Sequence, residues 1–293
     1  MRGCAAPVMF EARVPWLESL EVERVPCLLC GGTDATPVQC FVLNGQPLAT
    51  VRCPRDGLLW LDPRPVPAFY ELLYAEHYYG VPPDDPLFEQ ASLPAQAPRP
   101  EKRQAAGWRM DEIERHSLPG RAPGRLLEVG FGGGEVLEAA YARGWEVLGL
   151  ESVAACVVSA LARGLPARQR RLADLARDEA LAGDFDAVGM FSVLEHVLDP
   201  ERTLLDARRL LRPGGVLALR LPETPPQGAP ASLIAHVYHF DKATIAALLR
   251  RCGFRVVHAE TAGIWRPTQY PGELPNMNVL SRTPVRRRPR AAR

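Results

Sequence analysis

Long apolar runs are missing from this chain of 293 residues. No stretch of about 18 consecutive apolar residues occurs, which excludes a membrane-spanning helix. The first residues, Met1 to Pro7, also contain no apolar core of the kind that a secretion signal requires. We therefore expect a soluble cytoplasmic protein without a membrane partner.

A strong excess of charge is also missing, because 35 basic and 34 acidic residues give a formal net charge of +1. Six arginines and no acid lie between Arg282 and Arg293, so the rest of the chain is about five units negative. A negative body repels phosphate groups, so the sequence argues against a nucleic-acid partner. Residues 283–293 are expected to form a basic disordered tail.

Cysteine is scarce over most of the chain, but four of the seven cysteines lie between residues 27 and 53. In a cytoplasmic protein such a cluster suggests a metal before disulfides. A C-x-x-C pair followed by two glycines resembles a zinc knuckle, and Cys53-Pro54-Arg55-Asp56 repeats its frame with a carboxylate in the last position. The expected zinc ligands are Cys27, Cys30, Cys53 and Asp56. Cys40 could substitute as a thiol ligand, and the alternative is a ribbon that has lost its metal.

A glycine-rich turn lies near the middle of the chain. A mostly apolar run over residues 126–129, which contains the acid Glu128, is followed by Gly130, Gly132 and Gly134 and then by a helix-like segment. This pattern predicts a buried strand, a tight turn and a helix start. Glycine suits such a turn because the backbone takes positive φ and approaches a ligand closely. The dinucleotide fingerprint G-x-G-x-x-G is absent, since its third glycine would fall on Glu135.

The string acid-x-Gly-x-Gly-x-Gly resembles the first motif of the class I S-adenosylmethionine-dependent methyltransferases. The alternative is a plain strand-to-helix connection. The resemblance continues over residues 124–282, where strand-like and helix-like segments alternate. It implies an α/β fold, namely a Rossmann-like doubly wound sheet of seven strands whose last strand is antiparallel. It also implies S-adenosyl-L-methionine as the cofactor.

Carboxylates at predicted strand ends are the candidates for holding this methyl donor. Glu151 ends the strand at 145–150, about 20 residues after Gly130, where it would accept the ribose hydroxyls. In the family, an acid after the third strand, here near 168–172, accepts the adenine amino group. Asp174 matches this acid and Leu175 would line the ring; the alternative for Asp174 is a helix cap. The expected donor-binding residues are Glu128, Gly130, Gly132, Gly134, Glu151, Asp174, Leu175 and Phe191.

The segment after the fourth predicted strand carries the candidate for catalysis. Glu195-His196 before an Asp-Pro turn resembles the family, whereas the N-P-P-aromatic turn of amino methyltransferases and the Pro-Cys of RNA cytosine enzymes are absent. His196, with an ordinary pKa near 6.5, is the first candidate for the general base. Its alternative roles are holding the loop and capping the next helix, and Glu195 is expected to be structural.

Four further residues are expected to contact the acceptor. His236 and His239 lie at the end of a proline-rich loop, at the position where the family builds acceptor pockets. Both are also alternatives to His196 as the base, and the other interpretation is a core or capping histidine. Tyr78 and Tyr79 end an aromatic helix predicted from residue 69 onwards and could cover the site. Tyr70 and Tyr74, earlier in this helix, are expected only to pack it on the main domain.

Together these patterns predict four parts. Residues 1–80 form a zinc-ribbon-like module with an aromatic helix, residues 81–100 a linker or lid, residues 101–282 the methyltransferase domain, and residues 283–293 the tail. The predicted function is in-line methyl transfer to a small molecule such as a secondary metabolite, sugar, quinone or lipid. The alternatives are an RNA-modifying enzyme that uses the ribbon and the arginine tail, and a non-catalytic protein that binds the cofactor.

Overall fold

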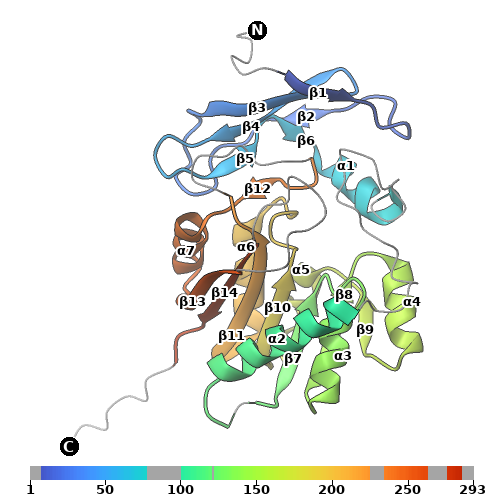
Figure 1. Cartoon of the computed structure of the whole chain (residues 1–293), viewed down its shortest axis with the longest axis vertical. Coiled ribbons are helices and arrows are strands. Elements are labelled where there is room, and N and C mark those ends of the chain that lie inside the picture. Colours follow the sequence, from blue (N-terminus) through green and yellow to red (C-terminus); the bar gives the residue numbers. More distant parts are fainter. Residues whose placement is uncertain (1–7, 78–99, 121, 225–233, 263–275, 286–293) are drawn as a thin grey trace, which may run out of the picture.

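The computed structural model describes residues 8–77, 100–120, 122–224, 234–262 and 276–285. Two sheets make up most of this part of the chain. The smaller, N-terminal sheet lies above the edge of the larger sheet at which β10 ends (Figure 1). None of the helices in the described ranges combines the length and the apolar character needed to cross a lipid bilayer.

The N-terminal sheet contains five strands in the order β1-β3-β4-β5-β12. Its strands are β1 (Val8–Ala12), β3 (Thr36–Leu43), β4 (Gln46–Arg52), β5 (Leu59–Leu61) and β12 (Tyr238–His239). A two-residue turn joins β3 to β4, with Asn44 at φ 45° and Gly45 at φ 77°, which is the geometry that an Asn-Gly pair favours in hairpins. The last strand, β12, comes from the far end of the chain and pairs with β5 in antiparallel orientation.

The aromatic helix follows a small two-stranded sheet of β2 (Val22–Glu23) and β6 (Arg64–Pro65). It begins as α1 (Pro67–Leu72) and continues as the π-helical turn η1 (Leu73–His77). Phe69 and Tyr70 are buried in its first turn. The positions of Tyr78 and Tyr79, and of the predicted linker up to residue 99, lie outside the described residues.

The larger sheet has seven strands in the order β13-β14-β11-β10-β7-β8-β9. Only β14 runs antiparallel to its neighbours β11 and β13. The seven-stranded doubly wound sheet with an antiparallel last strand is therefore confirmed. Its strands are β7 (Arg125–Val129), β8 (Glu146–Glu151), β9 (Ala167–Gln169), β10 (Phe185–Phe191), β11 (Leu211–Pro222), β13 (Arg255–Ala262) and β14 (Asn276–Arg282).

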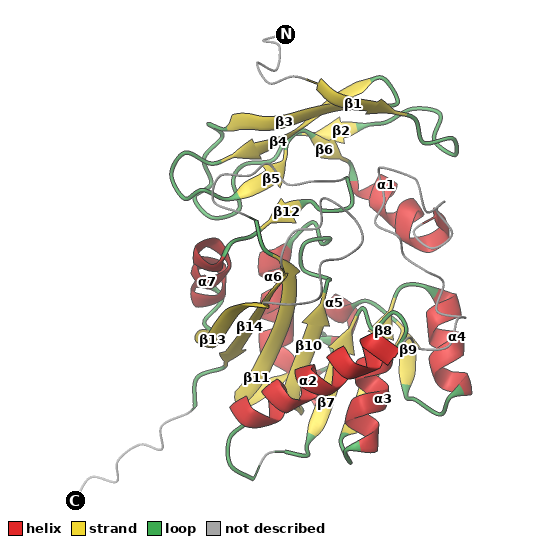
Figure 2. Ribbon diagram, viewed as in Figure 1, coloured by secondary structure: helices red, strands yellow, loops and turns green. Residues whose placement is uncertain are grey.

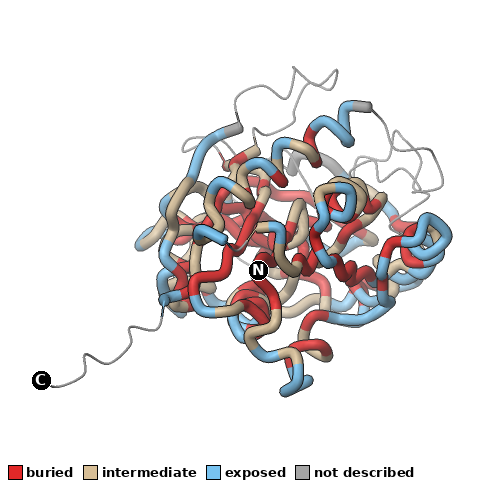
Figure 3. Tube along the Cα trace, turned by 90° about the horizontal axis from the view of Figure 1, so that it is seen from below, coloured by how far each residue is buried: buried red, intermediate tan, exposed pale blue. Residues whose placement is uncertain are grey.

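Helices cover both faces of this sheet (Figure 2). Alternate side chains of the strands face opposite ways, so Leu126 packs in a core with α2 and α3, whereas Leu127 packs in a core shared with α6, α7 and the N-terminal sheet. Figure 3 shows this buried interior. The helices are α2 (Pro100–His116), α3 (Glu135–Ala142), α4 (Ala154–Ala162), α5 (Leu172–Leu175), the 3-10 turn η2 (Glu179–Leu181), α6 (Pro200–Leu210) and α7 (Lys242–Arg251).

The described chain continues past β14 for three residues. Thr283, assigned to the tail by composition, is buried; its backbone N–H donates to Gly215 O at 3.1 Å and its hydroxyl donates to Arg212 O at 2.7 Å. The packed part of the domain therefore reaches Thr283. Residues 286–293 of the predicted tail lie outside the described residues.

Candidate functional site

The glycine turn connects β7 to α3 in a conformation that side chains would disturb. Gly130, Gly132 and Gly134 have φ of 66°, 51° and 77°. A Cβ on Gly130 would lie 2.6 Å from Cγ2 of Val193, so the segment after β10 packs directly on this turn. Positive φ and close approach together explain the glycines that the sequence pattern shows.

Glu151 lies at the end of β8 and its buried carboxylate points toward the glycine turn. One carboxylate oxygen accepts from the N–H of Gly132 at 2.9 Å, and the other accepts from the N–H groups of Ser152 at 2.7 Å and Val153 at 3.2 Å. The structure therefore brings together two groups that the sequence places about 20 residues apart. A carboxylate fixed in this way can accept from ligand hydroxyls at the carboxyl edge of the sheet.

Glu128 is buried within β7, and burial raises the pKa of its carboxyl group to about 8. The nearby positive charge of Arg109 acts in the opposite direction. Glu128 is therefore mostly protonated at neutral pH.

Arg109 of α2 is a charged residue at this site that the sequence analysis missed. Its guanidinium carbon lies 4.8 Å from the ring centroid of Phe191, a residue expected to contact the donor. Burial and the charge of Arg220 lower the pKa of Arg109 to about 10, so it remains a cation at neutral pH. Within the described part of the chain, the Arg109 guanidinium forms no ion pair or hydrogen bond. No local signal distinguishes this arginine from the exposed arginines of the same helix.

A cleft of about 280 Å³ lies between α2 and the upper part of β10, β11, β13 and β14. Aromatic, charged and polar side chains line it together with apolar ones. They include Trp108, Arg109, Phe191, Arg220, Glu260 and Asn278.

The residues predicted to hold adenine are placed differently from the expectation. The third strand ends at Gln169, and Asp174 lies within α5 rather than at a strand end. Its carboxylate accepts from Arg177 at 2.9 Å, while the Leu175 side chain is buried in the core. The capping role considered for Asp174 is filled by Asp178, which accepts from the N–H of Ala180.

His196 follows β10 and is buried beside the N-terminal module. Its Nδ1 lies 2.9 Å from Ala235 O and 3.1 Å from the Tyr74 hydroxyl. A carbonyl oxygen only accepts, so Nδ1 carries the hydrogen and Nε2 is the basic nitrogen. Tyr74, which was expected to pack the aromatic helix on the main domain, therefore also contacts the predicted catalytic residue. Tyr70 donates to Ile234 O at 3.1 Å in the same loop.

Two further histidines join His196 in a buried cluster. The ring centroids of His196 and His236 lie 4.7 Å apart, and those of His236 and His239 lie 5.9 Å apart. Burial holds the pKa of His239 well below its usual value, so this imidazole is neutral. The structure thus brings together His196, predicted as the base, and His236 and His239, predicted as acceptor contacts. It also adds Glu195, whose backbone oxygen accepts from the N–H of Val237 at 2.8 Å.

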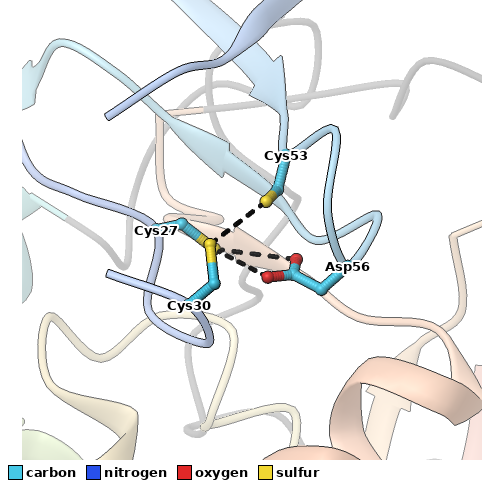
Figure 4. A group of neighbouring side chains, drawn as sticks. All are labelled: Cys27, Cys30, Cys53 and Asp56. Carbon is cyan, nitrogen blue, oxygen red and sulfur yellow. Dashed lines mark hydrogen bonds between the residues drawn. The ribbon is translucent and has the colours of Figure 1, made fainter. Parts of the chain in front are cut away.

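The predicted zinc ligands converge in the N-terminal module (Figure 4). Cys27, Cys30, Cys53 and Asp56 bring one ligand atom each within 4.8 Å of the others. Cys30 and Cys53 have a sulfur separation of 3.5 Å, and the Cys27 thiol donates to Asp56 at 3.3 Å. Burial raises the pKa of the Cys27 and Cys53 thiols, so both are neutral until a cation displaces the protons. Cys40 is not in this group; it lies in β3 and is disulfide-bonded.

The strand order of the larger sheet, together with an acid-tipped second strand beside a glycine turn, defines the domain of the class I S-adenosylmethionine-dependent methyltransferases. The methyltransferase domain family matches residues 101–259, which is more than half of the chain. The chain belongs to this family.

Similar proteins agree with this assignment. The ubiquinone biosynthesis O-methyltransferase of Chromobacterium violaceum is 38% identical over 114 residues, which cover 36% of this chain and 47% of that protein. The protein of the same name from Marinobacter nauticus is 38% identical over 108 residues, covering 35% and 44% of the two chains. This chain therefore spans less than half the length of these relatives.

Two solved structures share the fold. The cyclase SpnF has a TM-score of 0.50 at 19% identity, covering 66% of this chain and 86% of its own. A methyltransferase in complex with the Haloferax volcanii Trm112 activator has a TM-score of 0.50 at 16% identity, covering 64% and 94%. At this identity the likeness concerns the fold alone.

Proposed function

We propose that this protein transfers a methyl group from S-adenosyl-L-methionine to a small-molecule acceptor. The observation that carries the proposal is the buried Glu151 carboxylate, hydrogen-bonded to the glycine turn across two neighbouring strand ends. A carboxylate at this place offers acceptors for the two ribose hydroxyls, while the glycine turn leaves room for the methionine part of the donor. The O-methyltransferase name of the relatives supports a small-molecule acceptor.

Arg109 supports the same placement of the donor. Its guanidinium lies above Phe191 at the end of β10, close to Glu128 in the adjacent strand. We assign to Arg109 the carboxylate of the methionine part, because an arginine presents a planar pair of donors that matches a carboxylate. The adenine contacts of Asp174 and Leu175 remain a prediction; one oxygen of the Asp174 carboxylate already accepts from Arg177.

The acceptor side of the site is formed by the histidine cluster. Methyl transfer from a sulfonium is an in-line displacement, so alignment of donor and acceptor can supply up to about 7–11 kcal/mol. An acceptor that must also lose a proton needs a group that takes up or stabilises the charge. We assign this task to the cluster around His196, because it follows β10 and the same segment packs on the glycine turn through Val193.

The N-terminal module is proposed to be a zinc site that also completes the catalytic site. Three thiols and one carboxylate are a suitable donor set for zinc. From the same module, β5 pairs with β12 and Tyr74 contacts His196. The module thus has a use in small-molecule methylation, and no described contact favours an RNA acceptor.

Calorimetric titration with S-adenosyl-L-methionine, and in parallel with NADH, tests the proposal. We expect micromolar binding of the methyl donor and none of NADH. An acceptor screen with radiolabelled donor would then begin with phenols, enols and sugars. If the folded protein fails to bind the donor, the proposed activity is refuted.

A further inference from the structure

A second group of possible metal ligands lies in the histidine cluster, separate from the cysteines. Glu195, His196 and His236 each bring a ligand atom within 4.8 Å of the other two. Zinc holds nitrogen and oxygen ligands at about 2.0–2.2 Å, so any two ligand atoms around one ion lie no more than about 4.4 Å apart. Small rotations of these side chains would therefore suffice to enclose a cation.

The orientation of His196 suits metal binding. Its Nδ1–H donates to Ala235 O at 2.9 Å, which leaves the lone pair of Nε2 on the side of the Glu195 carboxylate, 4.0 Å away. Histidines that bind metals usually donate their other ring N–H to a carbonyl or carboxylate in this way, which fixes the tautomer and the plane of the ring. The Tyr74 hydroxyl touches the same nitrogen from the N-terminal module.

Backbone hydrogen bonds hold the two ligand-bearing segments together. Val237 donates to Glu195 O at 2.8 Å, and Tyr238 donates to the same oxygen at 3.3 Å. The residue that precedes Val237 supplies the His236 ring, whose centroid lies 4.7 Å from that of His196. The three ligands are therefore positioned by the fold itself and require no large movement.

The charge and burial of the group also favour a cation. Glu195, His196 and His236 are exposed to 2%, 9% and 5%, so a carboxylate and two imidazoles share an interior with little water. Buried carboxylates and imidazoles are groups that metal ions bind in protein interiors.

We infer that Glu195, His196 and His236 bind a divalent first-row transition metal beside the methyl-donor site. Two imidazoles and one carboxylate suit such an ion better than Mg²⁺, which prefers an all-oxygen shell. Three protein ligands leave coordination positions for a further ligand, as in catalytic rather than structural metal sites.

The location gives the metal a use in the proposed reaction, and this part of the inference rests on the proposed function. The Glu195-His196 pair is separated by one residue from Val193, which packs on the glycine turn. A cation there would lower the pKa of an acceptor hydroxyl. The hydroxyl proton then passes to solvent water, the oxygen forms its bond to the methyl carbon, and the sulfur–methyl bond of the donor breaks to give the neutral thioether. The acceptor class that fits is a compound with a phenolic or enolic hydroxyl, methylated on oxygen.

Titration of the metal-free full chain with Co²⁺, followed by absorption, tests the site without an acceptor. Cobalt bound by the three thiols gives intense charge-transfer bands in the near ultraviolet, whereas cobalt bound by Glu195, His196 and His236 gives only weak bands in the visible. We expect two equivalents to bind per chain, one with each signature. A wild-type titration that shows the thiolate signature alone overturns the inference.

Substitutions identify the ligands. Glu195→Gln and His236→Gln should weaken binding of the second equivalent by about tenfold or more and leave the thiolate bands unchanged. His239→Gln is the matched control, since His239 is equally buried in the same cluster but is not a member of the group; it should keep both equivalents. Equal second-site affinity in all three variants would overturn the assignment.

Donor binding separates this inference from the proposed function. Calorimetry with S-adenosyl-L-methionine depends on Glu151 and the glycine turn, and it needs no metal. If the wild-type chain shows no second cobalt site but binds the donor, the metal site is rejected and the methyltransferase activity is retained. If the donor fails to bind but the second cobalt site is intact, the metal site is retained and the methyltransferase activity is rejected. The proposed use of the metal is then rejected as well.

Discussion

Replacing Glu151 by glutamine should weaken binding of the methyl donor by about 10- to 100-fold. Glutamine keeps the length of the side chain but removes its charge and one of its two acceptor oxygens. The structure shows both oxygens in use, one on Gly132 and the other on Ser152 and Val153. Hydrogen bonds to a charged group contribute about 1.5–3 kcal/mol, and each 1.4 kcal/mol is a factor of ten in Kd, which gives the expected range.

The amide also places an NH₂ group against a backbone N–H, whichever way it turns. A buried donor left without an acceptor costs about 1–3 kcal/mol, so the variant should unfold at a lower temperature than the wild type. The binding assay is calorimetric titration with S-adenosyl-L-methionine, after circular dichroism has shown that the variant is folded.

Glu146→Gln is the matched control, because Glu146 begins the same strand, is exposed and pairs with Arg125 at the surface. A surface pair contributes about 0–1 kcal/mol, so this variant should bind the donor as the wild type does. An unchanged Kd in folded Glu151→Gln would refute the assignment of Glu151 to the ribose.

Further predictions concern the rest of the site. Burial raises the pKa of Glu128 from 4.5 to about 8, so the folded state holds this proton more tightly than the unfolded chain. The contribution of this proton to the free energy of unfolding is complete below pH 4.5 and is lost as the pH rises toward 8. Denaturant unfolding across this range should therefore show a steeper decline for wild type than for Glu128→Gln, by up to about 5 kcal/mol in total. Gly130→Ala should destabilise the fold more than Gly164→Ala, because both positions have positive φ but only Gly130 faces a side chain at 2.6 Å; equal melting temperatures would contradict the packing argument. Arg109→Gln should weaken donor binding by about tenfold in the same calorimetric assay, whereas Arg103→Gln, on the exposed side of the same helix, should not. Metal analysis should find zinc bound to the N-terminal module of the wild type and lost in Cys27→Ser; equal zinc content of the thiolate site in both proteins would argue against the assigned ligands.

Alternating strand-like and helix-like segments predicted a parallel sheet with crossover helices, and the family resemblance added its seven strands and the antiparallel last strand. The strands β7, β8 and β10 are short, mostly apolar runs that end at polar or glycine-rich turns, and α6 and α7 begin at capping aspartates. The acid at the end of β8 and the glycines after β7 are read from spacing alone, because parallel strands bring their carboxyl ends to one edge. The cysteine group was predictable for a similar reason, since two short loops each carry a pair of ligands.

Contacts between distant segments could not be predicted in the same way. Tyr74 and His196 are 122 positions apart, and no pattern around either residue indicates the other. Arg109 has the same sequence surroundings as an exposed helix arginine, and only the packing of α2 on the sheet places it over Phe191. Asp174 lies in a helix and not at the predicted strand end, because the third strand is only three residues long and α5 begins earlier than the apolar residues suggested.

The pairing of β5 with β12 has a consequence for synthesis on the ribosome. Residues 59–61 emerge early, but the strand that completes their sheet is at 238–239, after most of the larger sheet has been made. Until then β5 presents an unpaired edge, which in a nascent chain is a site for wrong pairing and aggregation. The N-terminal module therefore reaches its final form only as the histidine loop docks, so that its folding and the assembly of the catalytic edge occur as one late event.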